Sequence, residues 1–515
     1  MAEPGSTNPA TGAALEPIAA TPLSEVAEVV ARARRAQPGW GKASLEDRSE
    51  RAIELSRRIL ERRSEIVKLL SDETGRDETE CLMSEVASAM EYAKAAVKVA
   101  RKALAKELLD ISALDYPGKS GFIEAVPRGV IGIIAPWNYP LGNFMKSIFP
   151  ALLSGNAVVL KPSEHTPRSG AWLRAICESV FPRDLVGLVV GRGDAGELLA
   201  RQVDAIVFTG SVRTGKRVAL IAAERLIPCS LELGGKDAAI VLEDCDLPRT
   251  LAGVLQWGMH NAGQNCAGIE RVYVVEPIAD RFVTRLGEMA KQLRVAPGEG
   301  PTDLGPLQNE AQLSIVERHV AEAIQKGATL VVGGKPTGRG LGYEPTILDR
   351  CNEDMAVVRE ETFGPVLAVC RVKDAEEAIR RANDSSYGLN GSVWTKDLAR
   401  GLELARRLEV GVSLVNNHSI CGIMADAAWT GTKDTGPGIA ASRFAYSNFV
   451  RRRTVLIDKA KAPDPWWMPA SPELAAFGAA LVQRSIGSKL GALAKLAGLV
   501  GKRTKTIQAL ASGKS

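Results

Sequence analysis

The chain has 515 residues, of which 45% are hydrophobic and 24% charged. This length predicts about three folding units at roughly 150 residues each, and the composition excludes disordered and fibrous proteins. The net charge is +5, no run of 18 apolar residues occurs, and residues 1–12 have no apolar segment. We therefore expect neither a transmembrane helix nor a secretory signal, and a soluble cytoplasmic protein.

The positive charge is concentrated at the C-terminus. Residues 471–515 carry seven Lys or Arg and one acidic residue, whereas residues 1–470 carry 58 basic and 59 acidic side chains. A nearly neutral body argues against a nucleic-acid partner. The eight cysteines contain no CxxC pair and the four histidines no i,i+4 pair. We therefore expect no metal site and no disulfide framework.

The first hundred residues have the pattern of surface helices. Apolar positions recur at helical spacing from 23 to 109, with Ser24 as the cap of a helix that ends at Pro38-Gly39. Ser44, followed by Asp47, is expected to form a capping box. The charged side chains between 51 and 63 are interpreted as solvated helix faces.

Two α/β stretches follow, one up to about residue 241 and one from 271 to about 430. Short apolar runs that alternate with helices are typical of buried parallel strands joined by βαβ crossovers. Helices are expected at 169–180, 214–226 and 280–294. Strands are expected at 130–134, 157–160, 186–190, 205–208, 238–241, 272–275, 329–332 and 366–369. Two further segments, 111–126 and 443–458, are predicted to be extended and to form an edge sheet between subunits.

The tail from residue 471 has an amphipathic helical pattern, weakened by several glycines. Its apolar side chains fall on one predicted face: Val482, Ile486, Leu490, Leu493, Leu496 and Val500. Two interpretations stay open. The tail packs on the body or is loosely ordered, or it is an interfacial helix that gives peripheral contact with a membrane.

Two glycine-rich segments follow predicted strands. Residues 191–196 match GxGxxG, but no acidic residue follows at the spacing of about 20 that a dinucleotide fold needs. We expect a tight turn there first and a phosphate cradle second. Residues 208–215 run from a strand into a helix, whose first N–H groups can bind an anion. A plain strand-to-helix turn would explain Gly210 and Gly215 equally well.

Three residues have reactive side chains in unusual settings. Glu232 ends an apolar strand, so it is either a paired or capping glutamate or a general base whose pKa is raised by burial. Cys266 has Gly, Gln and Asn as neighbours instead of core residues, and an electropositive or helix-terminal setting would favour its thiolate. Asn138, between Pro136 and Pro140, offers an amide donor to an oxyanion.

Six motifs occur together in an order and spacing that resemble the NAD(P)-dependent aldehyde dehydrogenase superfamily, over about residues 5–465. They are Trp137-Asn-Tyr-Pro140, Lys161-Pro-Ser-Glu164, residues 208–215, Glu232-Leu-Gly-Gly-Lys236, Gly263-Gln-Asn-Cys266 and Glu360-Glu-Thr-Phe-Gly-Pro365. The resemblance implies an α/β fold with two Rossmann-like parallel-sheet domains and a small β oligomerisation element, followed here by a C-terminal helical tail.

The resemblance also implies roles for the reactive residues. Cys266 would attack the aldehyde to form a thiohemiacetal, and the amide of Asn138 with the backbone N–H of Cys266 would hold the oxyanion. After hydride transfer, Glu232 would activate the water that hydrolyses the thioester. The coenzyme-binding residues would be Trp137, Lys161, Glu164, Gly210, Ser211, Gly215, Glu361 and Phe363. Glu164 would bind the ribose hydroxyls and repel a 2′-phosphate, which favours NAD, with NADP as the alternative.

Some positions depart from the family pattern. Many members have a lysine nine residues after the asparagine, where this chain has Ser147, with Lys146 one place early. Residues 430–436 and 451–453 also differ from the usual sequence. These departures leave the nucleophile, the base and the oxyanion amide in place. A CoA-acylating enzyme and a membrane-associated non-catalytic homologue are the alternatives, and Glu232 argues against the first.

The resemblance divides the chain into four parts and implies a homodimer or homotetramer that acts on a small aldehyde. Residues 1–108 and 128–234 would form the NAD-binding domain, and 235–435 the catalytic domain. Residues 109–127 and 436–465 would form the oligomerisation element, and 466–515 the basic amphipathic tail.

Overall fold

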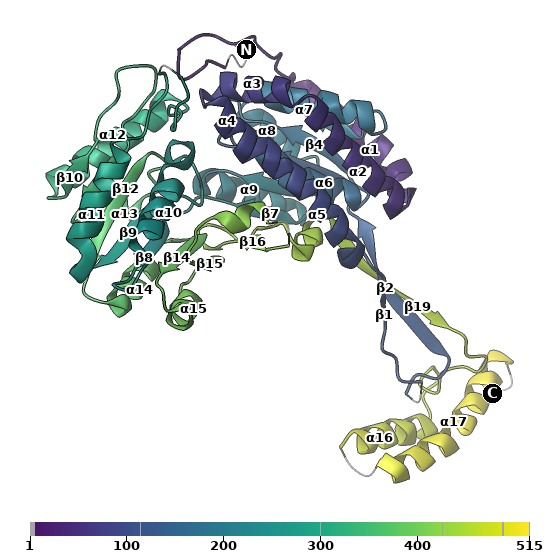
Figure 1. The fold of residues 1–515 in the computed structure, drawn as a ribbon. Helices are drawn as coiled ribbons and strands as arrows, with labels where there is room; N and C mark the ends of the chain where they lie inside the picture. The colour runs from purple at the N-terminus through teal and green to yellow at the C-terminus, as the bar shows by residue number, and fades with distance from the viewer. Residues whose placement is uncertain (1–5, 114, 299, 425, 487–488, 514–515) are drawn as a thin grey trace. The chain divides into compact units, whose positions relative to one another are not determined.

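The fold is described from a computed structural model that covers residues 6–113, 115–298, 300–424, 426–486 and 489–513. The chain separates into two compact units (Figure 1). The larger unit comprises residues 1–105 and 125–451, and the smaller unit residues 106–124 and 452–515. The boundary at 452 lies later in the chain than the predicted start of the oligomerisation element at 436, and the tail falls in the same unit as residues 106–124.

The first sheet of the larger unit is five-stranded and parallel, in the order β5-β4-β3-β6-β7. Every residue of β3 and β4 is buried, which explains why these strands are continuous apolar runs instead of alternating ones. Its strands are β3 (Val130–Ile134), β4 (Ala157–Lys161), β5 (Val186–Leu188), β6 (Ala205–Thr209) and β7 (Cys229–Glu232). The helices of this half are α1 (Val26–Lys42), α2 (Leu45–Glu61), α3 (Arg63–Thr74), α4 (Glu78–Cys81), α5 (Ser88–Ala103), α6 (Gly142–Leu153), α7 (Pro167–Val180), α8 (Gly193–Ala200) and α9 (Val212–Arg225).

The second sheet has seven strands in the order β10-β11-β12-β9-β8-β14-β15. All neighbours are parallel except β10, an edge strand antiparallel to β11. The strands are β8 (Asp237–Val241), β9 (Ile269–Val275), β10 (Thr329–Val332), β11 (Thr346–Asp349), β12 (Val366–Val372), β14 (Asn390–Trp394) and β15 (Val412–Val415). The helices are α10 (Leu247–Met259), α11 (Glu276–Ala290), α12 (Glu310–Gln325), α13 (Ala356–Arg359), α14 (Ala375–Asn383) and α15 (Leu398–Arg406). The predicted α/β fold with two parallel-sheet domains is confirmed.

Local predictions at the N-terminus had mixed outcomes. The capping box is confirmed, because the Ser44 hydroxyl accepts from the backbone N–H of Asp47 and the Asp47 carboxylate accepts from Ser44. The predicted helix end at Pro38 is wrong: α1 continues to Lys42, since the buried side chain of Trp40 anchors its last turn by donating to the carbonyl of Leu152. Ser24 is not the cap, because it lies inside the 3-10 turn η1 (Leu23–Glu25).

The two segments predicted to be extended are only partly so. In the first, β2 begins at Lys119, after a loop that follows the short strand β1 (Glu107–Leu108). In the second, η5 (Arg443–Asn448) is a 3-10 helix, capped by the hydroxyl of Ser442 and anchored by the buried ring of Tyr446. Only β19 (Val450–Asp458) is a strand, and it forms a three-stranded sheet in the order β1-β2-β19 with β2 (Lys119–Pro127). Two short pairs complete the strands: β13 (Tyr387–Gly388) with β17 (Thr432–Lys433), and β16 (Trp429–Thr430) with β18 (Ile439–Ala440).

The tail in the smaller unit forms two helices, α16 (Pro472–Ile486) and α17 (Lys489–Ala511), which pack against each other. The single apolar face predicted from the sequence is therefore wrong. Leu496 is buried in the same cluster as Phe477, whereas Val482 and Ile486 are exposed on α16; the side chain of Leu490 lies outside the described residues. Arg503 is buried and donates to the carbonyls of Pro465 and Trp467 and to the hydroxyl of Ser471, so the tail is tied to the segment before it. No helix within the described residues is long and apolar enough to cross a membrane.

Candidate active site

Cys266 lies in a tight loop that follows α10. The 3-10 turn η3 (His260–Gly263) leads into it, and Asn261 and Ala262 have left-handed backbone angles. Gly263 is also left-handed, at φ 71°, and a Cβ there would lie 1.9 Å from the carbonyl oxygen of Gly364. Only glycine fits such a position. The loop of the cysteine is thereby pressed against the 360–365 motif, so two motifs far apart in the sequence meet.

A cavity of about 200 Å³ opens beside this loop, and the partly exposed thiol of Cys266 forms part of its wall. The other walls come from α5, α6, α10 and the loop around η4 (Ile420–Ile423). Most of the wall surface is apolar and comes largely from aromatic rings, with polar side chains between them. Cavities of this composition bind small organic ligands, and its size suits a short substrate.

The side chain of Asn138 is fixed against the loop of the cysteine. Its amide nitrogen donates to the carbonyl of Gln264 at 3.1 Å, and its amide oxygen accepts from Asn143 at 3.3 Å. The amide of Asn261 donates to the carbonyls of both Asn138 and Gln264. An amide nitrogen has two N–H donors, so one remains for a ligand while the first holds the group in place.

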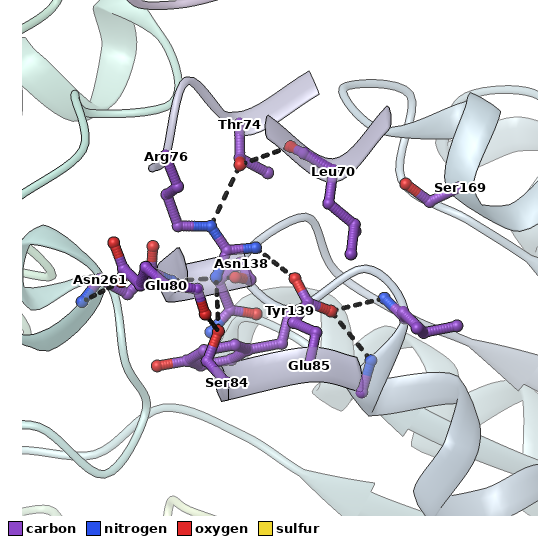
Figure 2. A network of polar contacts seen from close by, with 12 residues as sticks. Leu70, Thr74, Arg76, Glu80, Ser84, Glu85, Asn138, Tyr139, Ser169 and Asn261 are labelled. Atoms are coloured by element: carbon purple, nitrogen blue, oxygen red, sulfur yellow. Dashed lines mark hydrogen bonds and ion pairs between the residues drawn. The ribbon is translucent and has the colours of Figure 1, made fainter. Parts of the chain in front are cut away.

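A buried network of ion pairs and hydrogen bonds holds the backbone around Asn138 (Figure 2). Arg76 forms an ion pair with Glu85, and neither side chain is more than 1% exposed. The second carboxylate oxygen of Glu85 accepts from the backbone N–H groups of Leu141 and Gly142, which open α6. Glu85 comes from η2 (Leu82–Ala87), a π-helical turn, and such turns are frequent at functional sites.

A second carboxylate of the network holds the other side of the site. Glu80 accepts from the backbone N–H of Asn261 at 2.9 Å (Figure 2). The guanidinium of Arg76 also packs over the ring of Tyr139, and the hydroxyl of Tyr139 pairs with the imidazole of His260 at 2.9 Å. Burial lowers the pKa of His260 to about 4, with Arg76 adding to the effect, so this imidazole is neutral at physiological pH.

Glu232 ends β7 at the carboxyl edge of the first sheet. Burial raises the pKa of its carboxyl to about 6, against the ammonium of Lys146, which lowers it. The group is therefore mostly ionised at neutral pH and can accept a proton near that pH, as a general base must. No ion pair to Glu232 occurs among the described residues, so the interpretation as a salt-bridged glutamate is not supported.

Burial and charges of both signs act on the thiol of Cys266. Burial raises the pKa of its thiol to about 12, and the carboxylates of Glu232, Asp237 and Glu361 raise it further, while Lys146 lowers it. The resting group is therefore the thiol, whose proton must leave when the sulfur attacks, and Lys146 is the cation that favours the thiolate.

Lys146 and Ser147 occupy different sides of α6. Ser147 is buried, whereas Lys146 faces the cavity one helical turn after Asn143. The ammonium of Lys146 lies 5.0 Å from the ring centre of Trp429 and 5.8 Å from that of Tyr92. The shift of one place noted in the sequence thus moves the positive charge into the cavity.

Two predicted coenzyme-binding segments lie at the same edge of the first sheet. Strands β4 and β6 flank β3, and all three are parallel, so Lys161 at the end of β4 lies at the same edge as Trp137 and Gly210, which follow β3 and β6. Dinucleotides bind at this edge of such sheets. The ammonium of Lys161 lies 3.8 Å from the carboxylate of Glu164. The hydroxyl of Ser211 caps α9 by accepting from the N–H of Thr214, and Gly215 packs against Leu233.

The other two predicted coenzyme residues, Glu361 and Phe363, lie in the half of the larger unit that contains the second sheet. Glu361 accepts from the backbone N–H of Gly235 at 3.1 Å, and Phe363 packs edge-on against Trp137 with ring centres 5.5 Å apart. Burial raises the pKa of Glu361 to about 8. The structure therefore brings Trp137 and Phe363 together across the two halves. Residues 191–196 span the end of the loop that follows β5 and the first turn of α8, so the segment is only partly a turn.

Several supporting residues were not identified from the sequence. Glu270, buried in an ion pair with Lys236, accepts from the backbone N–H groups of Thr362 and Phe363 and so holds the 360–365 loop. Glu85 and Glu80 hold the Asn138 region in the same way. A carboxylate inside an apolar stretch was the available signal. It singled out Glu232 alone, because the others lie in helices rich in charge or in a strand with charged neighbours.

Comparison with known proteins gives consistent results. The family model described as "Aldehyde dehydrogenase family" matches residues 3–455. Lactaldehyde dehydrogenase of Escherichia coli (strain K12) is 34% identical over 457 residues, which are 87% of this chain and 94% of that protein. A protein of Mycobacterium ulcerans (strain Agy99), named as a putative NADP(+) succinate-semialdehyde dehydrogenase, is 36% identical over 415 residues, 79% of each chain. The structure of a Mycobacterium tuberculosis aldehyde dehydrogenase complexed with NAD+ superposes with a TM-score of 0.83 at 32% identity, covering 88% of this chain and 94% of that one.

Proposed function

The chain belongs to the aldehyde dehydrogenase family, and from this premise we propose that it oxidises an aldehyde to the carboxylate with a nicotinamide coenzyme. The observation that carries the proposal is the thiol of Cys266 in the cavity wall, next to a loop that is hydrogen-bonded to Asn138. NAD is the expected coenzyme and NADP the alternative. When bound, its nicotinamide ring supplies a hydride acceptor.

The first step is loss of the Cys266 proton to solvent through the cavity, which the ammonium of Lys146 assists because it lowers the pKa of the thiol. The sulfur then attacks the aldehyde carbon, the C–S bond forms, and the carbonyl electrons move to oxygen. The free N–H of the Asn138 amide stabilises this oxyanion together with the backbone N–H of Cys266, which has no acceptor among the described residues. Loss of hydride from the carbon leaves a thioester on Cys266.

The second half of the reaction is hydrolysis of that thioester. Glu232 takes a proton from water, the resulting hydroxide attacks the acyl carbon, and the C–S bond breaks with the electron pair returning to sulfur. Burial supports this role, because it raises the pKa of Glu232 towards neutrality. Transfer of the acyl group to CoA would not need this base. Hydrolysis is therefore favoured over the CoA-acylating alternative. The complete set of Cys266, Glu232 and Asn138 favours an active enzyme over a non-catalytic homologue.

The coenzyme would lie along the carboxyl edge of the first sheet. Glu164 is half-exposed beside Lys161, so its carboxylate is free to accept hydrogen bonds from two ribose hydroxyls. A 2′-phosphate on the same ribose would be repelled, which supports NAD. The first turn of α9 would bind the pyrophosphate through free N–H groups, and Glu361 and Phe363 would contact the second ribose. These side chains fit a dinucleotide in chemistry and in position on the sheet.

Membership of the family also suggests the roles of the domains and the oligomeric assembly. Residues 1–108 and 128–234 would bind the coenzyme, and 235–435 would carry the nucleophile. The sheet β1-β2-β19 has β19 at one edge, with exposed arginines along it. An open edge strand of nine residues is suited to pairing with another copy, which supports a homodimer or homotetramer.

The smaller unit supports one further candidate function, peripheral contact with an anionic membrane. Trp467, Met468 and Ile486 expose large apolar side chains, with 83% of Met468 and 85% of Ile486 accessible. Arg503 is buried, but Lys502 and Lys505 are exposed on α17. Aromatic and apolar groups with nearby cations bind membrane interfaces. Co-sedimentation of the full chain with phosphatidylserine-containing vesicles should fall at least about tenfold in a Trp467→Ser, Met468→Ser variant, and absence of binding by the wild type would exclude the function.

The proposed dehydrogenase activity is tested by following NADH absorbance with the purified full chain. A panel of short aliphatic, aromatic, hydroxy- and carboxy-aldehydes would be offered with NAD and, separately, with NADP. Formation of NADH and carboxylate in equal amounts is the expected result. Aldehyde-dependent NADH formation that persists unchanged in Cys266→Ser, or no NADH with any aldehyde, would contradict the proposal.

A further inference from the structure

The cavity beside Cys266 contains one formal charge at neutral pH, that of Lys146. Of the sixteen described residues that line the cavity, the other titratable ones are neutral there. His260 has its pKa lowered to about 4, and Cys266 has its pKa raised to about 12. No carboxylate belongs to the wall. A short substrate bound in the cavity therefore meets a positive charge that no lining residue neutralises.

The ammonium of Lys146 has no ion-pair partner among the described residues. Two aromatic rings, Trp429 and Tyr92, hold it at 5.0 and 5.8 Å from their centres, within the distance of cation–π contacts. Burial lowers the pKa of Lys146, and Tyr92 and the carboxylate of Glu232 raise it. A lysine with aromatic neighbours and no carboxylate partner is a binding group for an anion, because a bound anion would satisfy a charge that is otherwise only partly compensated.

The two rings and Lys146 also disfavour aldehydes that carry a positive charge. Paired aromatic rings in a pocket can bind a quaternary ammonium group. Here Lys146 already occupies that position between Trp429 and Tyr92. A cationic aldehyde would meet both an occupied aromatic pair and a like charge, and like charges at contact distance repel.

The helix α6 sets the spacing between this charge and the reacting end of the substrate. Asn143 contacts the oxyanion amide of Asn138, and Lys146 follows on the same face of α6 three residues later. Lys146 is close enough to Cys266 and Glu232 to lower the pKa values of both. A short substrate with its carbonyl at Cys266 would therefore have an anionic group at its far end on the side of Lys146.

We propose that Lys146 is a specificity-determining residue that binds a carboxylate at the far end of the substrate, so that the enzyme selects short aldehydes of the ω-oxo acid type. This inference rests on the proposed dehydrogenase function, because it needs the aldehyde carbon to be at Cys266. It assigns to Lys146 a contact with the substrate, in addition to its effect on the neighbouring ionisable groups.

The test compares three aldehydes of similar size: 4-oxobutanoate, its neutral methyl ester, and trimethylammonioacetaldehyde as the cation. The ratio of kcat/KM for the acid to that for the ester is the readout. Lys146 also acts on Cys266 and Glu232, but that effect is common to both aldehydes and cancels in the ratio. The wild-type ratio should be about 10 to 100, the range for a charge-assisted hydrogen bond, and the cation should be the poorest substrate.

Substitution then assigns the preference to the residue. Lys146→Met should bring the ratio to about 1–3, and Lys146→Arg should keep most of it, because the charge is retained. Lys94→Met is the matched control, since Lys94 is an exposed lysine on α5 that pairs with Glu91, and it should leave the ratio unchanged.

The outcomes separate this inference from the proposed function. Oxidation of the ester by the wild type without preference for the acid would overturn the inference and leave the dehydrogenase function standing. An unchanged ratio in Lys146→Met would do the same. Failure of the wild type to oxidise any of the three would overturn both. The wild-type ratio needs no variant and so decides the question even if a substitution impairs folding.

Discussion

The side-chain amide of Asn138 donates to the carbonyl oxygen of Gln264, two residues before Cys266, over 3.1 Å. The two residues are separated by 126 positions in the chain and come from different halves of the larger unit. This bond orients the amide, so that its second N–H is available beside the thiol. The nucleophile and the oxyanion donor are consequently fixed to one another before any substrate arrives, which is the preorganisation that acyl-transfer chemistry uses.

Removing the oxyanion donor should slow the reaction without unfolding the protein. We expect Asn138→Ala to lower kcat by about 10²–10³-fold, the usual cost of losing one such donor. Steady-state kinetics with NADH absorbance gives the value, and the thermal unfolding midpoint serves as the control. A loss of less than threefold would argue that the amide does not contact the oxyanion.

Activity should depend on the ionisation of Glu232. Burial raises the pKa of this carboxyl to about 6, so turnover should increase as the pH rises through that value and the base loses its proton. Glu232→Gln should remove this acid limb and slow hydrolysis of the thioester by about 10²-fold or more. The pH profile of kcat measures both. An acid limb that persists unchanged in the variant would assign it to another group.

The buried ion pair of Arg76 and Glu85 should be a large contributor to stability. Glu85→Gln leaves the guanidinium of Arg76 buried without its carboxylate partner and turns an amide NH2 group towards it, so we expect a loss of about 3–5 kcal/mol in the free energy of unfolding. Denaturant unfolding measures this. The control is Glu91→Gln, which breaks the exposed pair with Lys94 and should cost less than about 1 kcal/mol. Equal effects of the two substitutions would contradict the role given to the network.

The choice of coenzyme should depend on the carboxylate at position 164. Glu164→Ala removes the charge that would repel a 2′-phosphate, so kcat/KM with NADP should rise about tenfold relative to that with NAD. Glu178→Ala is the matched control, since Glu178 pairs with Arg174 on the exposed face of α7. If the ratio of the two coenzymes does not change in Glu164→Ala, another residue sets the preference.

The sequence was sufficient for the fold class, and it singled out Glu232 and Cys266 as candidate reactive residues. The strands at 130–134 and 157–161 are continuous apolar runs because both faces of the sheet are covered, and this pattern is visible in the sequence. Glu232 and Cys266 could be singled out because each differs in polarity or size from its neighbours. Features of this kind depend only on local sequence.

Other features depend on packing that local sequence does not encode. Whether Lys146 or Ser147 faces the cavity is decided by the rotation of α6, and one residue changes this by about 100°. Glu85 reaches the site because η2 is a π-helix, and the extra residue in its turn has no sequence signal that we could use. The pKa of Cys266 also depends on enclosure by distant segments, so the rise that this enclosure causes cannot be predicted from its sequence neighbours.

The central claim is that the sulfur of Cys266 becomes bonded to the carbonyl carbon of the substrate. The most direct test is to incubate Glu232→Gln, in which hydrolysis is slow, with coenzyme and aldehyde, and to locate the acyl group by peptide mass spectrometry. We predict an acyl adduct on Cys266, in an amount equal to the NADH formed in the first turnover. The adduct should be absent from the double variant that carries Cys266→Ser together with Glu232→Gln. A full turnover of NADH with no adduct on the peptide that contains Cys266, or with the acyl group on another residue, would contradict the account.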